Sequence, residues 1–336
     1  MSYLYVCEQG ATIGFADNRF QVRYKDGLLK SVPSEVLEVI EVFGKVQLTT
    51  QCIEECLKRG VNILYYSTNG AYFGRMISTN HVNVQRQRKQ ARLGENEEFK
   101  RELSKKLISA KINNQIVILR RYARTRGIDI HSPVAEMQYM AIKVCSEYTR
   151  DIEQIMGYEG RAARVYFQTL GQLINPEFAF QGRTRRPPLD PFNSMISLGY
   201  SIILNEIYGK LEGKGLNPYF GFMHKDREKH PTLASDLMEE WRAVLIDSTA
   251  LSLLNGHELN KDDFYTEMDQ PGVFLGKDGF KIYIQKLENK FRTKNRYLSY
   301  IDYSVSFRQA IDLQINQLVK AIEHEAVDEY LPIIIR

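Results

Sequence analysis

The sequence predicts an α+β protein with more than one domain, in which an N-terminal mixed β-domain is followed by a mainly α-helical domain. Up to residue 80, short runs rich in β-branched and aromatic residues alternate with glycine, Asp-Gly and Asn-Gly turns. Beyond residue 95, Leu and Ile recur at the helical period. A chain of 336 residues is long enough for about two domains with separate cores. We therefore place the domains at residues 1–80 and 96–336, with a basic linker at 81–95.

The N-terminal domain is expected to be a small mixed β-structure. Its predicted strands share β-branched and aromatic side chains and cover residues 4–6, 12–15, 20–24, 39–43, 63–66 and 72–76. One helix is predicted at residues 50–59, with Thr49 or Thr50 as its N-terminal cap and Gly60 at its end. No group of acids and histidines suggests chemistry here. A structural or dimerising role is therefore predicted for this domain.

A strongly basic stretch begins near the predicted linker. Its Lys and Arg side chains lie on segments with helical periodicity: Arg86, Arg88, Lys89, Arg92, Lys100, Arg101, Lys105, Lys106, Lys111, Arg120, Arg121, Arg124 and Arg126. Two interpretations stay open. The stretch is either a solvated helix face or a surface that faces phosphates.

The second domain is expected to be almost wholly helical. The helices predicted from apolar periodicity cover residues 134–156, 158–170, 193–211, 241–254 and 303–324, with a break at Gly157 between the first two. The helix at 193–211 is apolar on most faces and is predicted to lie centrally in the core. A short strand is predicted at 273–275. The apolar run at 331–335 is too short to span a membrane and is expected to dock on the core or on a partner.

The segment from residue 221 to 242 carries a candidate metal site. It places His224 in a loop and then Asp236 and Glu239 three positions apart, which is one face of a helix. One imidazole with carboxylate oxygens suits Mn²⁺ or Mg²⁺ better than structural Zn²⁺. The same spacing also fits a capping box, in which Asp236 caps a helix and Glu239 reaches back. Spacing alone leaves both interpretations open.

Two further segments add candidate residues. Glu159 lies beside small residues that let a second helix approach closely, so it belongs either to a crowded helix crossing or to an exposed helix N-terminus. The loop from 183 to 193 presents Arg183, Arg185 and Arg186 among three prolines. Because proline restricts the backbone, these guanidinium groups would be presented with little ordering cost, which suits phosphate contacts.

Composition excludes several classes of protein. The net charge of +4 is too small to indicate nucleic-acid binding by itself. Four cysteines without a Cys-x-x-Cys spacing predict neither a disulfide nor a zinc site. No charged and apolar leader is present at the start, and no stretch reaches 18 uncharged apolar residues. A cytoplasmic location without a membrane partner is therefore expected.

Four segments, taken in order and spacing, resemble one known family. They cover residues 159–167, 183–200, 215–224 and 233–242. Together they are similar to the CRISPR-associated integrase, the adaptation subunit that inserts new spacers into CRISPR arrays. The resemblance extends over nearly the whole chain. One departure is the loop at 225–231, where many members carry glycine and arginine and this chain has Lys-Asp-Arg-Glu-Lys-His-Pro.

The resemblance implies a catalytic helical domain with a divalent-metal site. Glu159, His224 and Glu239 would be the ligands of Mg²⁺ or Mn²⁺, and Asp236 would lie beside the metal and orient a ligand or water. The implied partners are double-stranded DNA as prespacer and CRISPR repeat, a second copy bound through the β-domain, and a small ferredoxin-like adaptation protein. The candidate DNA-binding residues are Arg183, Arg185, Arg186, Arg161 and Arg242.

Three hypotheses for function follow. The first is a metal-dependent DNA endonuclease/integrase that joins a 3′-hydroxyl to a target phosphate by transesterification. The second is a stand-alone metal nuclease that cuts branched DNA with the same residues. The third is a non-catalytic DNA-binding scaffold whose acids only cap helices. Joined products separate the first from the second, and metal dependence separates both from the third.

Overall fold

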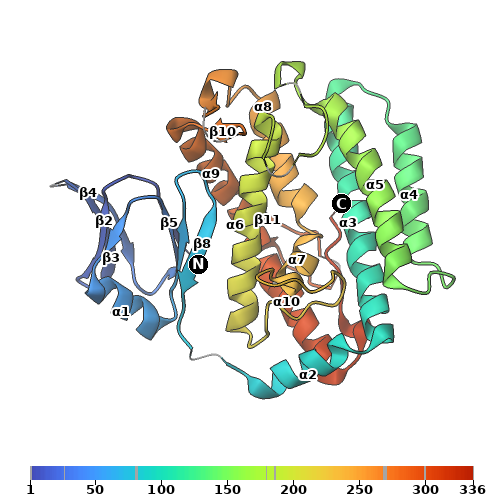
Figure 1. Cartoon of the computed structure of the whole chain (residues 1–336), viewed down its shortest axis with the longest axis horizontal. Helices are drawn as coiled ribbons and strands as arrows, with labels where there is room; N and C mark the ends of the chain where they lie inside the picture. The colour runs from blue at the N-terminus through green and yellow to red at the C-terminus, as the bar shows by residue number, and fades with distance from the viewer. Residues whose placement is uncertain are drawn as a thin grey trace. The chain divides into compact units, whose positions relative to one another are not determined.

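The computed structural model describes residues 2–25, 27–79, 82–178, 180–184, 187–267, 271–298 and 300–335. The chain divides into two compact units, Met1–Val82 and Asn83–Arg336. Figure 1 follows them from the blue strands of the first unit to the red helix α10 of the second. A β-rich N-terminal region precedes a helical region, which confirms the predicted fold class.

The first unit contains two four-stranded sheets and one helix. Its strands are β1 Ser2–Val6, β2 Thr12–Ala16, β3 Arg19–Tyr24, β4 Gly27–Pro33, β5 Leu37–Phe43, β6 Gln47–Leu48, β7 Asn62–Tyr66 and β8 Tyr72–Met76. One sheet has the order β1-β5-β7-β8, and the other has the order β4-β3-β2-β6. The pairs β1/β5, β5/β7 and β2/β6 are parallel. Both sheets are therefore mixed, as predicted.

Helix α1, Thr50–Arg59, begins and ends where the sequence predicts. The Thr49 hydroxyl accepts a hydrogen bond from the Cys52 amide at 3.2 Å, and Gly60 ends the helix with a φ of 72°. Cys52 and Cys56 lie in the core of this unit. Strand β4 was not predicted, because most of its side chains are exposed and show no apolar alternation.

The second unit is built from helices. They are α2 Val84–Gly94, α3 Glu97–Arg126, α4 His131–Val144, α5 Ile152–Leu173, α6 Pro191–Gly213, α7 Thr232–Met238, α8 Ser248–Asn255, α9 Lys277–Arg292 and α10 Phe307–His324. A π-helix covers Arg242–Asp247, and single 3₁₀ turns cover Pro176–Phe178, Lys261–Asp263 and Val327–Glu329. Two short antiparallel pairs join β9 Phe264–Tyr265 to β10 Phe274–Leu275, and β11 Lys294–Asn295 to β12 Val305–Ser306.

Two helices organise this unit. Helix α3 spans 30 residues and packs against α4 and α5, as the turquoise to green helices of Figure 1 show. Helix α6 is buried on most of its faces and contacts α7, α8 and the π-helix, which confirms its predicted central place. Residues 81–95, predicted as a basic linker, include α2, and α2 packs against α3 and α10.

Some predicted helix boundaries are wrong. The break expected at Gly157 lies instead at residues 145–151, and Gly157 is inside α5. The cause is a local cap, because the Asp151 carboxylate accepts a hydrogen bond from the Gln154 amide at 2.7 Å and starts the helix there. Helix α10 likewise begins only after Ser306, which forms a capping box with Gln309. Within the described ranges, no helix is both long and apolar enough to cross a bilayer.

Candidate active site

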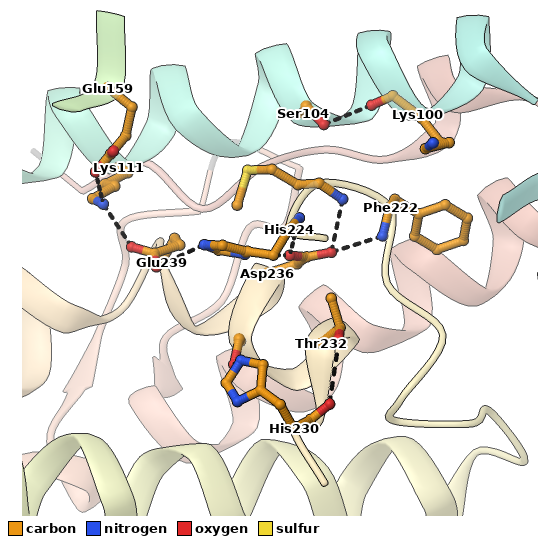
Figure 2. A network of polar contacts seen from close by, with 12 residues as sticks. Lys100, Ser104, Lys111, Glu159, Phe222, His224, His230, Thr232, Asp236 and Glu239 are labelled. Atoms are coloured by element: carbon orange, nitrogen blue, oxygen red, sulfur yellow. Dashed lines mark hydrogen bonds and ion pairs between the residues drawn. The ribbon is translucent and has the colours of Figure 1, made fainter. Parts of the chain in front are cut away.

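The site forms where α3, α5 and α7 meet the loop that precedes α7. Glu159 comes from α5, Lys111 from α3, and Glu239 directly follows α7. His224 lies in the loop between α6 and α7. Figure 2 shows the Lys111 side chain between Glu159 and Glu239, with the His224 ring between Glu239 and Asp236. The structure thus brings together all four residues that the sequence singled out, and adds one lysine.

Asp236 anchors the histidine loop. Its Oδ2 accepts hydrogen bonds from the amides of Phe222 and Met223 at 2.8 and 3.0 Å, and its Oδ1 accepts one from the His224 amide at 3.2 Å. Asp236 is fully buried and lies inside α7, which begins at Thr232. The capping-box interpretation is therefore wrong, because this carboxylate serves the loop and not the helix start.

Gly221 lets this loop pass close over α7. A Cβ atom at this position would lie 2.4 Å from Thr232 Cγ2 and 2.9 Å from Asp236 Oδ2. No side chain fits in that space, since real Cβ atoms do not approach other atoms so closely. Glycine at this position therefore allows the three loop amides to reach the Asp236 carboxylate.

His224 has its ring fixed by the same carboxylate. Its Nδ1 lies 2.6 Å from Asp236 Oδ1, so Nδ1 carries a proton and Nε2 is turned toward Glu239 Oε1 at 3.9 Å. Burial opposes the charged imidazolium, but the hydrogen bond and charge of Asp236, with the charge of Glu239, outweigh it and raise the His224 pKa. A histidine held in this way has one free ring nitrogen for a ligand.

Glu239 is ionised and surrounded by cations. Only 4% of its side chain is exposed, while Lys111 Nζ lies 2.7 Å from its Oε2 and Arg242 Nη2 lies 3.0 Å from its Oε1. Burial alone would raise the pKa of this carboxyl, but the charges of Arg242, Lys111 and His224 lower it to about 2. Glu239 therefore carries a full negative charge at neutral pH.

Lys111 is the part of the site that the sequence analysis did not single out. Its ammonium group contacts the Glu159 carboxylate as well as Glu239, and its side chain is 10% exposed. Burial would lower the Lys111 pKa, but the two carboxylates outweigh it and raise the pKa. In the sequence, Lys111 is one of many basic residues with the same helical spacing, so nothing there distinguishes it.

The donor set fits a divalent cation if Lys111 moves. Two carboxylates and one imidazole nitrogen suit Mg²⁺ or Mn²⁺. In the arrangement seen, no acids, histidines or cysteines of the described ranges are grouped closely enough to hold a metal ion. Glu239 Oε2 is buried, and Lys111 Nζ lies 2.7 Å from it. This oxygen is thus held by a single flexible ammonium group.

A network of hydrogen bonds fixes Glu240, the residue that follows Glu239. The Glu240 carboxylate accepts hydrogen bonds from the Tyr330 hydroxyl at 2.8 Å, the Ile333 amide at 2.8 Å and Gln314 Nε2 at 2.9 Å. Burial raises the Glu240 pKa to about 8. Asn114, one turn after Lys111, donates to the carbonyls of both Glu240 and Ile333. The apolar run at 331–335 therefore docks on the core.

The candidate DNA-binding arginines have different surroundings. Arg242 contacts Glu239 and stacks over the Tyr200 ring at 4.8 Å. Arg183 donates hydrogen bonds to Asn193 Oδ1 at 2.9 Å and Ser197 Oγ at 3.3 Å. The Arg161 side chain is largely exposed, and its Nε donates to Glu136 Oε1 at 2.7 Å. Arg185 and Arg186 lie outside the described residues.

The chain is similar to known proteins over most of its length. The family described as CRISPR associated protein Cas1 matches residues 4–289. A CRISPR-associated endonuclease Cas1 of Mycobacterium tuberculosis is 38% identical over 323 residues, which is 96% of this chain and 94% of that protein.

Two solved structures share the fold. A casposase bound to integration product aligns with a TM-score of 0.84 and 20% identity over 97% of this chain and 91% of that chain. A Cas6-RT-Cas1–Cas2 complex contains a chain that aligns with a TM-score of 0.82 and 24% identity over 98% of this chain, which is 36% of that longer chain. By the family match and the mycobacterial identity, this chain belongs to the CRISPR-associated protein Cas1 family.

Proposed function

We propose that this protein is a metal-dependent DNA endonuclease/integrase that inserts short double-stranded DNA fragments into a CRISPR array. The observation that carries the proposal is the convergence of Glu159, His224 and Glu239 at one place. The mycobacterial relative is named an endonuclease, and the casposase of the same fold is bound to an integration product. Both names support the same class of phosphoryl-transfer chemistry.

The reaction exchanges one phosphodiester bond for another. The 3′-hydroxyl oxygen of the fragment attacks the scissile phosphorus and loses its proton, while the bond from phosphorus to the target 3′-oxygen breaks and that oxygen gains a proton. Glu159, Glu239 and His224 would hold Mg²⁺ or Mn²⁺. When bound, the ion polarises the phosphate and offsets negative charge on the leaving oxygen.

The remaining residues keep the ligands in position. Asp236 keeps the proton on His224 Nδ1, which leaves Nε2 free on the side of Glu239. Arg242 contacts Glu239 Oε1 and stabilises its ionised form. The Glu240 network fixes the backbone next to Glu239. Together these contacts fix Glu239 and the His224 imidazole beside each other.

The proposed partners are double-stranded DNA as prespacer and CRISPR repeat, a second copy of the chain, and a small ferredoxin-like protein. The structural relative described as a Cas6-RT-Cas1–Cas2 complex supports a protein partner. For the homodimer, the β-domain offers the edge strand β8, on which Phe73 is 72% exposed. We expect Phe73→Asp to convert a dimer to a monomer in light scattering. An unchanged mass would exclude this edge.

A strand-joining assay tests the reaction. The full chain and its partner are incubated with a labelled duplex and a plasmid that carries a repeat, with Mn²⁺ or with a chelator. Glu159→Gln and Glu239→Gln should each lower joining by roughly a thousandfold, because the metal contributes several kcal/mol to the transition state. Glu97→Gln is the control, since Glu97 is exposed on α3 away from this contact network. Cleavage without joined products would favour the stand-alone nuclease.

Measuring DNA binding by the same variants distinguishes the scaffold hypothesis from the two catalytic hypotheses. Phosphate contacts supply most of the affinity, so Glu159→Gln and Glu239→Gln should bind DNA nearly as well as the natural chain. Joining that persists in the chelator, or in both variants, would overturn the proposed metal site. DNA binding by the natural chain without any joining or cleavage in Mn²⁺ would leave only a DNA-binding role for this protein.

A further inference from the structure

We propose that Lys111 is an internal substitute for the divalent ion, and that its ammonium group must leave Glu159 and Glu239 before the ion can bind. Lys111 would thereby set the metal affinity of the site. This inference rests on the proposed function, because it concerns the same pair of carboxylates. It assigns a positioning role to a side chain that the reaction scheme above does not use.

The position of Lys111 between two carboxylates is the one that a shared ion would take. Lys111 Nζ contacts carboxylates from two separate elements, α5 and the end of α7, as Figure 2 shows. It lies 2.7 Å from Glu239 Oε2, and Mg²⁺ binds carboxylate oxygens at about 2.0–2.1 Å. An ion that binds both carboxylates would therefore occupy the space of the ammonium group. The two cations exclude one another.

The contact of Lys111 with Glu239 is a single ion pair. Glu239 Oε2 lies 2.7 Å from the ammonium group. Lysine is a compact point charge on a flexible stem of four carbons, so it can leave without breaking a rigid bidentate arrangement. A spherical ion also needs no particular hydrogen-bond direction. The contact of Lys111 with Glu239 is thus of the type that a metal ion can replace.

The charges of the cluster support the same exchange. Glu159 and Glu239 carry two negative charges, and Lys111 and Arg242 carry two positive charges in contact with them. These four charges balance without a metal. When a divalent ion replaces Lys111 between the carboxylates, one positive charge is in surplus, which a DNA phosphate would offset. Metal binding and DNA binding should therefore strengthen each other by the same factor.

Direct binding of Mn²⁺ to the DNA-free full chain tests the inference. Calorimetry, or electron paramagnetic resonance of the free ion, gives the affinity without any turnover. Lys111→Met removes the charge and keeps much of the side-chain volume, and we expect it to bind Mn²⁺ at least tenfold more tightly than the natural chain.

Lys105→Met is the matched control. Lys105 lies on the same helix, its side chain is also 10% exposed, and its Nζ lies 3.0 Å from Glu102 Oε1. Glu102 does not belong to the site. Lys105→Met should therefore leave the Mn²⁺ affinity unchanged.

If Lys111→Met is less stable than the natural chain, thermal unfolding with and without Mn²⁺ still tests the inference. Without Lys111, the two carboxylates lack a shared cation, so Mn²⁺ should raise the Tm of Lys111→Met by more than it raises that of the natural chain. The inference is overturned if Lys111→Met binds Mn²⁺ no more tightly than the natural chain. It is also overturned if stability lost in Lys111→Met is not restored by Mn²⁺, because Lys111 would then be a permanent structural cation.

Two further variants distinguish this failure from failure of the proposed function. Glu159→Gln and Glu239→Gln should each weaken Mn²⁺ binding. If both bind Mn²⁺ as the natural chain does, the metal site itself is wrong. If both lose Mn²⁺ while Lys111→Met equals the natural chain, only the role of Lys111 is wrong.

Discussion

Two clusters in the helical unit each place one cation between two buried or partly buried carboxylates. Lys111 lies between Glu159 and Glu239, and the Arg308 guanidinium lies between two others. The Arg308 group makes hydrogen bonds of 2.9 to 3.2 Å to both of its partners, which are Glu206 and Glu288. Such a rigid fork joins α6, α9 and α10 permanently.

The Arg308 and Lys111 clusters carry similar charges but differ in how firmly the cation is held. Around Arg308 the cation is fixed by several directed bonds and its side chain is 3% exposed. Around Lys111, each of the two carboxylates meets one flexible ammonium group, and a partly exposed histidine faces Glu239. The first cluster is built for stability, and the second allows one cation to be exchanged for another.

The largest effect is expected from a substitution that disrupts the Arg308 cluster. Arg308→Met should lower the free energy of unfolding by about 3–5 kcal/mol, because it removes the buried cation that contacts the Glu206 carboxylate. Mn²⁺ should not restore this loss, in contrast to Lys111→Met. Urea unfolding with and without Mn²⁺ measures both variants.

Arg292→Met is the control for Arg308→Met. Arg292 also contacts Glu288, with Nε 2.6 Å from Oε1, but its side chain is 55% exposed. Solvent screening should limit its effect to about 1 kcal/mol or less. Equal losses in the two variants, or recovery of Arg308→Met with Mn²⁺, would remove the distinction between the clusters.

A third buried acid shows what happens without a cation in contact. Within the part of the chain that the structure describes, the Asp247 carboxylate accepts hydrogen bonds from the hydroxyls of Tyr166 and Tyr200, at 2.8 and 2.5 Å. Burial raises its pKa from 3.8 to about 6, although the tyrosine hydrogen bonds and nearby arginines oppose the shift. Because the folded-state pKa is raised, stability is lost as the pH rises from about 4 through 6.

This loss can be measured as a difference between two proteins. The free energy of unfolding of the natural chain minus that of Asp247→Asn should fall by about 3 kcal/mol between pH 4 and pH 6 and then stay level. Subtraction removes the titration of other groups. Urea unfolding at a series of pH values gives the curve, and a difference that rises over this range would contradict the assignment.

The contacts of Asp236 with the histidine loop are expected to affect metal binding. Asp236→Asn should weaken Mn²⁺ binding by roughly 10–100-fold, because an amide cannot accept all the bonds from the loop amides and His224 Nδ1. Ser235→Ala is the control, since its hydroxyl contacts His230 instead. If Asp236→Asn binds Mn²⁺ normally, the loop does not depend on this carboxylate.

The smallest expected effect concerns the arginines of the loop at 183–193. Arg183 is hydrogen-bonded within the protein, so Arg183→Gln should lower Tm and leave the salt dependence of DNA binding unchanged. Arg185→Glu and Arg186→Glu should each flatten the slope of log affinity against log salt by about one unit if they contact phosphate. Slopes equal to that of the natural chain would exclude phosphate contacts for both residues.

The fold class and most N-terminal strands could be predicted because their signals are local. Apolar alternation and turn residues mark strands such as β3 and β5, and Thr49 and Gly60 mark the ends of α1. Where two local signals for a helix end conflicted, the predicted helix boundary was wrong. Gly157 suggested a helix end, but in α5 its missing Cβ faces open space and has no structural consequence.

The candidate site was predicted only in part. The resemblance of motifs pointed to Glu159, His224, Asp236 and Glu239, and the structure places them together. Spacing alone left the role of Asp236 open, because its partners are loop amides more than ten positions earlier in the chain. Lys111 was missed since only the packing of α3 against α5 brings it to Glu159.

The bonds to Glu240 also determine when the site can become ordered during protein synthesis. Glu240 and its donor Ile333 are separated by 93 positions. At about 5–20 residues per second, a ribosome needs roughly 5–20 s to translate that interval. All proposed ligands are thus made several seconds before the segment that fixes the neighbour of Glu239. A nascent chain in that interval carries the acids and the imidazole of the site without two of the donors that Glu240 has in the folded protein, Tyr330 and Ile333.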